Sequence, residues 1–159
     1  MPALLVGAAA CDLASYTIPN RIQIGLLVAF AVFAAAAGMD AGALGNHLLA
    51  GAIALAAGFT LFALGYVGGG DAKLFACVGL WFGLGDLFAY TLIASVLGGG
   101  LTIAILSARQ MRLPGALAGQ GWIARLHAAD SGIPYGVALA AGALAFLPYA
   151  EIFRLAQGG

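Results

Sequence analysis

The chain alternates long apolar stretches with short breaks of proline, glycine or charged residues. Six apolar stretches can be delimited, at about 2–17, 22–38, 47–66, 71–83, 87–107 and 133–149, with one long loop at about 108–132. None alternates with period two, as the strands of a lipid-facing barrel would. Frequent glycine and alanine let helix backbones approach closely. The pattern predicts an all-α fold, a polytopic membrane protein with a bundle of about six transmembrane helices.

The breaks between the stretches carry recognisable turn residues. Ile18-Pro19-Asn20 ends the first stretch, because proline disfavours helix at the preceding residue, and Asn20 suits the N-cap of the second. A polar break is expected at 39–46. Gly85-Asp86 indicates a tight turn between the fourth and fifth stretches. In the long loop, Trp122, Ile123 and Leu126 have helical spacing, which favours a short interfacial helix.

Composition places the chain in lipid. Its 159 residues suit one domain, expected to be membrane-embedded over residues 1–159. Hydrophobic residues make up 64% and charged residues 8%, against about 45–50% and about 25% in a soluble domain. Lys+Arg and Asp+Glu are six each, so no bulk charge favours a nucleic-acid partner. Cys11 and Cys77 lie in apolar stretches and form no CxxC, so no metal or redox pair is expected.

The N-terminal stretch is interpreted as a retained membrane helix. No Lys or Arg precedes its apolar residues, whereas a secretory signal has a basic n-region. Only eleven residues precede Asp12, fewer than the roughly 20 that a span needs, which favours a start further upstream.

Basic residues predict the orientation. The connections after the first, third and fifth stretches carry Arg21, Lys73, Arg109, Arg112 and Arg125. The other side holds one basic residue, Arg154, with the acidic residues Asp40, Asp86 and Glu151. Since basic loops stay in the cytoplasm, we expect the N-terminus outside and loop 108–132 inside.

Two aspartates stand out as candidate chemistry, because an ionisable residue in a membrane helix is costly. Asp12 lies roughly 9 Å before the break at Pro19. Asp71 follows three glycines, which permit unusual backbone angles and close approach of another chain. The alternatives are that Asp12 reaches the interface or pairs with Arg21, and that Asp71 is an ordinary N-cap. Lys73 either stabilises a carboxylate or anchors to headgroups.

Taken together, the two aspartates are a stronger indication of a catalytic site than either one alone. Both are predicted at the cytoplasmic ends of their helices, so they can meet at the same depth in the membrane. Two carboxylates in a low dielectric do not both ionise readily. One can then activate water while the other, protonated, polarises a carbonyl, as in aspartic peptidases. No Gly-x-Ser-x-Gly or HExxH motif supports a serine or zinc peptidase. A proton-relaying transporter or channel component is the alternative function, and a structural assembly protein is a third. A transporter would need polar residues along a path across the bilayer, and the sequence has few of them.

Three motifs together resemble those of the type IV prepilin peptidases, which are GxGD-type intramembrane aspartic peptidases. They are Asp12 with Ile18-Pro19-Asn20, then Gly68-x-Gly70-Asp71-Ala72-Lys73-Leu74, then Ile133-Pro134-Tyr135-Gly136-Val137-Ala138, in the family's order on the first, fourth and last stretches. The resemblance implies that Asp12 and Asp71 are the catalytic residues. It also implies that Pro134-Tyr135-Gly136 packs beside the site.

The resemblance further implies a substrate and a location. The substrate would be a prepilin or pseudopilin with a basic leader, cut at the cytoplasmic face of the bacterial inner membrane before its hydrophobic segment. About five residues join the first two stretches, with no insert and no paired cysteines. This resembles the small peptidase-only members of tight-adherence (Flp) pilus systems, without methyltransferase activity and without a cofactor. The pilin cleaved, the oligomeric state and the role of Gly98–Gly100, close packing or a kink, stay open.

Overall fold

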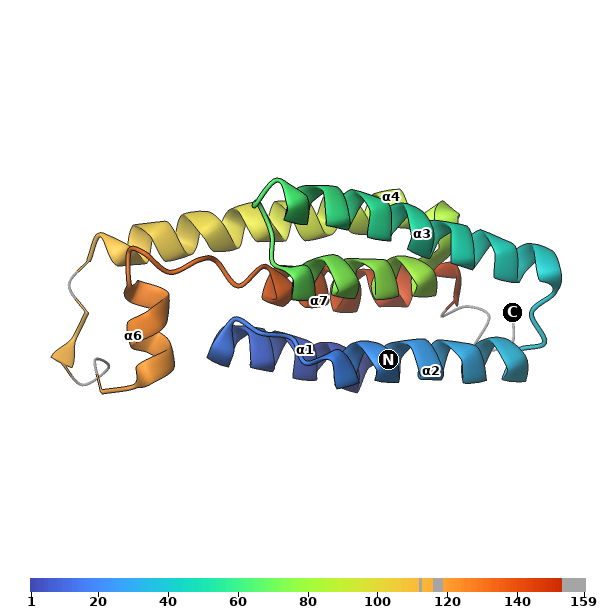
Figure 1. Cartoon of the computed structure of the whole chain (residues 1–159), viewed down its shortest axis with the longest axis horizontal. Coiled ribbons are helices and arrows are strands. Elements are labelled where there is room, and N and C mark those ends of the chain that lie inside the picture. Colours follow the sequence, from blue (N-terminus) through green and yellow to red (C-terminus); the bar gives the residue numbers. More distant parts are fainter. Residues whose placement is uncertain (112, 116–118, 153–159) are drawn as a thin grey trace.

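The computed structural model describes residues 1–111, 113–115 and 119–152, which form an elongated bundle of helices (Figure 1). Arg112 and Arg154 of the charge count lie outside the described residues. Within them no strand occurs, so the predicted all-α bundle is confirmed. The helices are α1 (Pro2–Ser15), α2 (Asn20–Ala36), α3 (Ala41–Ala63), α4 (Gly69–Arg109), α6 (Gly121–His127) and α7 (Tyr135–Phe146), followed by a 3₁₀ turn at Leu147–Tyr149.

Helix α4 is a hairpin of two helices rather than one rod. Gly83 has φ 72° and ψ 176°, a backbone conformation open essentially to glycine alone, and the chain reverses there. The first half of α4 (69–82) and the second half (84–109) then run side by side (Figure 1). Tyr90 of the second half packs its ring against Phe75 and Phe82 of the first, at 5.8 and 5.2 Å between centroids. The predicted six apolar helices are therefore present.

The hairpin turn is bound to α3 by two adjacent polar residues. Asn46 Oδ1 accepts a hydrogen bond from the Leu84 N–H at 2.8 Å, and His47 Nδ1 lies 2.8 Å from the Leu80 carbonyl oxygen. Both residues lie inside α3, so the predicted polar break at 39–46 was wrong for most of its length. The predicted turn at Gly85-Asp86 falls instead at Gly83, because both residues are already in the returning helix.

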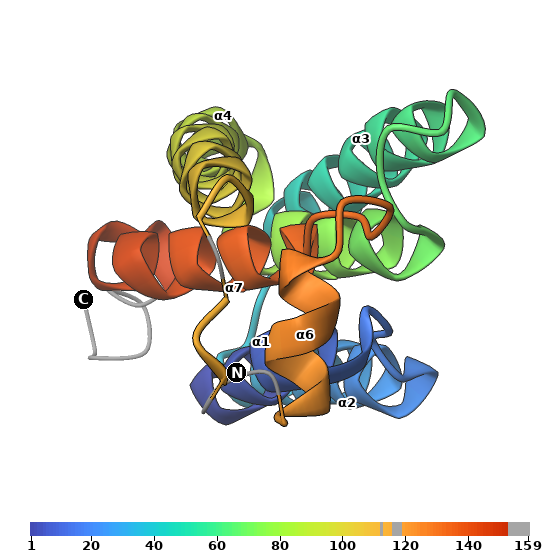
Figure 2. The same cartoon turned by 90° about the vertical axis from the view of Figure 1, so that its left-hand side faces the viewer.

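The helices are arranged around the first half of α4. Seen end-on, this half lies between α3 on one side and α1 with α2 on the other, while α7 crosses the middle of the bundle (Figure 2). Small residues bring the backbones together: a Cβ on Gly58 would lie 3.0 Å from the Ala72 Cα, and a Cβ on Gly142 would lie 2.9 Å from the Ala94 Cα. Close packing of small residues is typical of helix contacts within a membrane.

The outer surface is apolar. Phe88, Ile103, Val96 and Val32 expose more than 60% of their surface, and α3 and α4 are long and apolar enough to cross a membrane. Three shorter helices, α1, α2 and α7 with its 3₁₀ turn, are also apolar and are 10–17 residues long. A surface of this kind is stable in lipid rather than in water.

One end of the bundle carries the short helix α6 (Figure 2). Arg109, at the end of α4, donates to the Leu126 carbonyl and the Ser131 Oγ at 2.8 and 2.9 Å, which ties the segment after α4 back to the bundle. Arg125 donates to the Ala14 carbonyl of α1. The short helix predicted around Trp122 is therefore present as α6, on the same end as Arg21 and Lys73.

Candidate active site

Asp12 and Asp71 come together at this end of the bundle. Both line one cavity of about 150 Å³ between the end of α1, the start of α2 and the start of α4. Both side chains are buried, with 4% and 8% of their surface exposed. The structure therefore brings the two aspartates together in one cavity, as the sequence predicted.

Each aspartate is held by the end of its own helix. Asp12 lies in the last turn of α1, whose C-cap, Tyr16, has the left-handed φ of 53° and donates its N–H to the Asp12 carbonyl at 2.8 Å. Asp71 lies three residues after the N-cap Gly68 and accepts the Gly68 N–H through Oδ2 at 3.1 Å. A side chain that reaches back to the N-cap amide satisfies a helix donor without internal partner. Asp71 is thus not the N-cap itself.

The glycines beside the aspartates allow neighbouring segments of the chain to pack closely. Gly68 has an ordinary φ of −74°, so the predicted unusual backbone angles are absent there. Instead, a Cβ on Gly70 would lie 3.3 Å from the Ile18 Cβ, and one on Gly136 would lie 2.6 Å from the Ile18 Cδ1. The buried Ile18 side chain therefore packs between Gly70 and Gly136. In this way the three motifs that resemble the family, each of which contains one of these residues, contact one another.

Gly136 also sets the position of Asp12. A Cβ on Gly136 would lie 2.8 Å from the Asp12 Oδ2, closer than real Cβ contacts allow. The backbone amide of Gly136, in the first turn of α7, faces the Asp12 carboxylate. The expectation that Pro134-Tyr135-Gly136 packs beside the site agrees with this contact.

Polar contacts brace α4 against α2 next to the site. The buried Gln23 donates Nε2–H to the Gly70 carbonyl at 3.1 Å, one residue before Asp71. Lys73 Nζ donates to the Asn20 Oδ1 at 3.2 Å. The N-cap of α2 is Pro19, and Asn20 is the first residue of the helix, so the prediction of Asn20 as the N-cap was wrong. Gln23 was not singled out from the sequence, although an amide side chain inside an apolar helix was the available indication.

The cavity is suited to water and a peptide group. Asp12 Oδ2 and Asp71 Oδ1 are buried and have no hydrogen-bond partner among the described residues. Buried polar atoms without a partner are rare and call for a bound water or ligand. At about 30 Å³ for each water, the cavity holds several waters or part of an extended peptide. Two carboxyl groups with free oxygens beside such a space can transfer protons to and from a reacting group.

Asp40 and Asp86, which were predicted to lie on the other side of the membrane, do not line the cavity. Asp40 caps the start of α3, accepting the Ala43 N–H at 2.7 Å. Asp86 accepts the Glu151 N–H at 2.7 Å at the opposite end of the bundle. Within the described ranges, no group of three His, Cys, Asp or Glu side chains is placed to hold a metal ion.

The glycine run at 98–100 serves close packing at one position. A Cβ on Gly98 would lie 3.1 Å from the Tyr135 Cε1, whereas Gly99 and Gly100 have open space around them. The helix continues regularly through all three. Of the two roles left open by the sequence, close packing therefore applies at Gly98.

Comparison with known proteins agrees with the motifs. The chain belongs to the type IV leader peptidase family, whose model matches residues 1–103 and so includes both Asp12 and Asp71. No curated protein and no solved structure matches the chain significantly. Family membership defines a membrane-associated leader peptidase with prepilin-type substrates.

Proposed function

We propose that this chain is an aspartic endopeptidase, with Asp12 and Asp71 as its catalytic residues. The observation that carries the proposal is the shared buried cavity, in which each aspartate keeps one oxygen without a hydrogen-bond partner among the described residues. Membership of a leader peptidase family supports the reaction class.

The reaction would be hydrolysis by an activated water. One carboxylate accepts a proton from water, whose oxygen then attacks the carbonyl carbon of the scissile peptide bond. The other carboxyl group, protonated, donates a hydrogen bond to the carbonyl oxygen and stabilises the tetrahedral intermediate. The C–N bond then breaks as the leaving nitrogen takes up a proton. Water is the only co-reactant, and no cofactor takes part.

The substrate would be a prepilin or pseudopilin whose basic leader is removed at the cytoplasmic face. In this topology the chain is a multi-pass protein of the bacterial inner membrane, with its N-terminus outside and the whole of 1–159 acting as one peptidase domain. The clustering of Arg21, Lys73, Arg109 and Arg125 at the end of the bundle that bears the site supports this orientation. The absence of paired cysteines from the sequence supports the peptidase-only form of Flp pilus systems.

The test is cleavage of a co-expressed prepilin, followed by the size shift on a gel and mass spectrometry of the new N-terminus. Asp12→Asn and Asp71→Asn should each abolish cleavage while the protein stays folded and inserted, since asparagine keeps the shape of aspartate but cannot exchange the proton. Asp40→Asn and Asp86→Asn are the matched controls and should process normally. Lys73→Ala should give an intermediate rate, and the product N-terminus should be unmethylated. Normal cleavage by either active-site variant would exclude the aspartic mechanism.

A further inference from the structure

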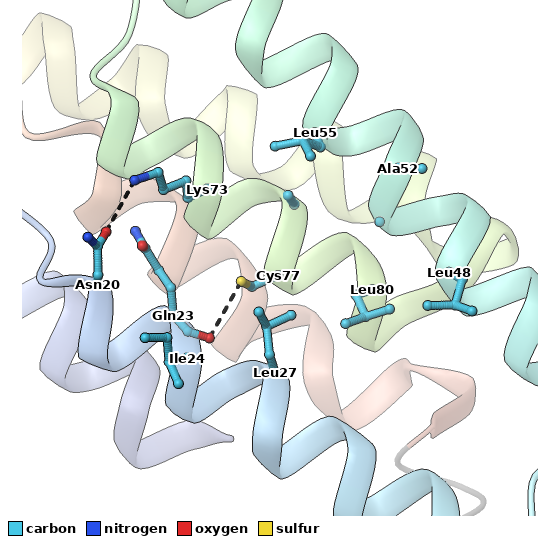
Figure 3. Close-up of a pocket in the computed structure, with 12 residues that line it drawn as sticks. Asn20, Gln23, Ile24, Leu27, Leu48, Ala52, Leu55, Lys73, Cys77 and Leu80 are labelled. Atoms are coloured by element: carbon cyan, nitrogen blue, oxygen red, sulfur yellow. Dashed lines mark hydrogen bonds between the residues drawn. The ribbon is translucent and has the colours of Figure 1, made fainter.

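A second, larger cavity adjoins the site. It is an open groove of about 460 Å³ between α2 and α3, with the first half of α4 as its floor (Figure 3). Its volume is typical of a ligand-binding pocket. The groove exists because α2 and α3 pack on opposite sides of α4 instead of against each other (Figure 2).

The groove is lined by one face of each helix. On the floor, Lys73, Cys77 and Leu80 follow one another at helical spacing, so the groove runs along α4 for about two turns, or roughly 10 Å. Gly51 and Ala76 also line the groove where α3 packs on α4, since a Cβ on Gly51 would lie 3.1 Å from the Leu80 Cβ and 3.5 Å from the Ala76 carbonyl oxygen. The Cys77 thiol is already engaged, since its Sγ lies 3.8 Å from the Gln23 carbonyl oxygen.

The walls of the groove are apolar and uncovered. Ile24 and Leu27 on α2 and Leu48 and Leu55 on α3 expose between 46% and 58% of their surface. Leu48 and Leu27 mark the end of the groove away from the aspartates, and Asn20 the near end (Figure 3).

The near end of the groove meets the catalytic cavity. Asn20 and Lys73 line both spaces, and their hydrogen bond lies at the border between them. A ligand in the groove therefore begins beside Asp71 and continues along apolar walls toward the opposite end of the bundle. Because the polar catalytic cavity continues into an apolar groove, the two spaces together suit a polypeptide that is polar at the cleavage site and apolar directly after it.

We propose that this groove binds the first two turns of the apolar helix that follows the scissile bond of the substrate, running parallel to the first half of α4. The inference rests on the proposed function. A bound helix places its N-terminal end, and hence the scissile bond, at the border with the catalytic cavity. The groove thereby selects substrates in which an apolar helix follows the cleavage site directly.

Filling the groove tests the proposal. Ala52 on α3 lines the groove, and Ala57 lies on the same helix outside it, and both are exposed. With purified protein and full-length prepilin, Ala52→Phe should lower kcat/KM by about tenfold or more, through KM. Ala57→Phe should leave both constants unchanged. Equal kcat/KM values for the two variants would contradict substrate binding in the groove. The proposed function would still hold in that case if the wild type cleaves the prepilin and Asp71→Asn does not.

A disulfide cross-link gives a second measurement that does not depend on turnover. The protein carries Asp71→Asn, Cys11→Ala and Cys77→Ala, with either Leu48→Cys in the groove or Ala57→Cys outside it. The prepilin carries a single cysteine about seven residues after the scissile bond, two turns into its helix. A cross-link is expected with Leu48→Cys alone. Equal cross-linking at both positions, or none at Leu48→Cys, as when lipid alone fills the groove, would refute the proposal.

Discussion

At the scale of single residues, the site depends on glycines that allow contact rather than on glycines that allow unusual angles. Gly70 and Gly136 hold the Ile18 side chain between them, and Gly136 also touches Asp12. The motifs therefore matter as contact surfaces around two carboxyl groups. Substitution of Gly136, the glycine opposite Asp12, should therefore reduce activity although Gly136 takes no part in the reaction.

Gly136→Ala should lower the cleavage rate by roughly 10–100-fold, because a displacement of about 1 Å at a reacting group has an effect of that size. Its Cβ would lie 2.8 Å from the Asp12 Oδ2, so the carboxylate must shift. Gly99→Ala is the control, since Gly99 is helical and has open space around it. Prepilin cleavage by the two purified variants is the measurement. A Gly136→Ala enzyme with the wild-type rate would show that Asp12 tolerates the added methyl group.

Gln23→Leu should lower the free energy of unfolding by about 0.5–1.5 kcal/mol, since it removes the hydrogen bond from the buried Gln23 amide to the Gly70 carbonyl. Gln110→Leu removes an exposed amide at the end of α4 and should be neutral. Unfolding of both variants in detergent, compared with the wild type, checks this. If the two substitutions have equal effects, the Gln23–Gly70 bond contributes nothing of its own.

Asp12 and Asp71 could be selected from the sequence because a carboxylate in an apolar helix is rare and costly. Gln23 could not be distinguished in the same way from other polar residues, because its importance comes from the carbonyl that its amide meets across two helices. The packing of Ile18 between Gly70 and Gly136 joins positions far apart in the chain. No local pattern encodes such a contact.

At the scale of elements, the apolar stretches located the helices, but their ends depended on tertiary contacts. The segment at 41–46 looked like a break because it is short of large apolar residues. It is helical because Asp40 caps it and Asn46 and His47 bind the hairpin turn of α4. Hydrophobicity reports contact with lipid, whereas these polar side chains bind backbone groups of a neighbouring helix.

Gly83→Ala should destabilise the protein by about 1–3 kcal/mol, because its φ of 72° with ψ of 176° is strained for any other residue. The His47 ring would also lie 3.2 Å from the added Cβ. Gly85→Ala, two residues later in the returning helix with open space, should be neutral or slightly stabilising. The midpoint of thermal unfolding in detergent distinguishes them. Equal midpoints would contradict the role of Gly83 in the reversal.

At the scale of the whole molecule, the basic residues that the structure describes gather at the end that bears the aspartates, α6 and the start of α7. Acidic Asp86 and the Glu151 backbone meet at the other end. This polarity predicts the topology of the bundle in the membrane and, with it, the face at which the substrate is cut.

Cysteine labelling of intact cells tests this topology, in a protein with Cys11→Ala and Cys77→Ala. Gln120→Cys, beside α6, should resist a membrane-impermeant thiol reagent added from outside and react after the membrane is opened. Ala37→Cys, exposed at the end of α2 before the turn to α3, should react from outside. The reverse pattern would place the site on the outer face and contradict cleavage at the cytoplasmic side.

The central claim is that Asp12 and Asp71 act as one catalytic unit, and the double variant measures this most directly. Residual prepilin cleavage is compared for Asp12→Asn, Asp71→Asn and the protein that carries both substitutions. Each single variant should lose at least about a hundredfold in rate, and the double variant should lose no more than the worse single one. Losses that multiply, or a single variant that still cleaves at the normal rate, would contradict the account.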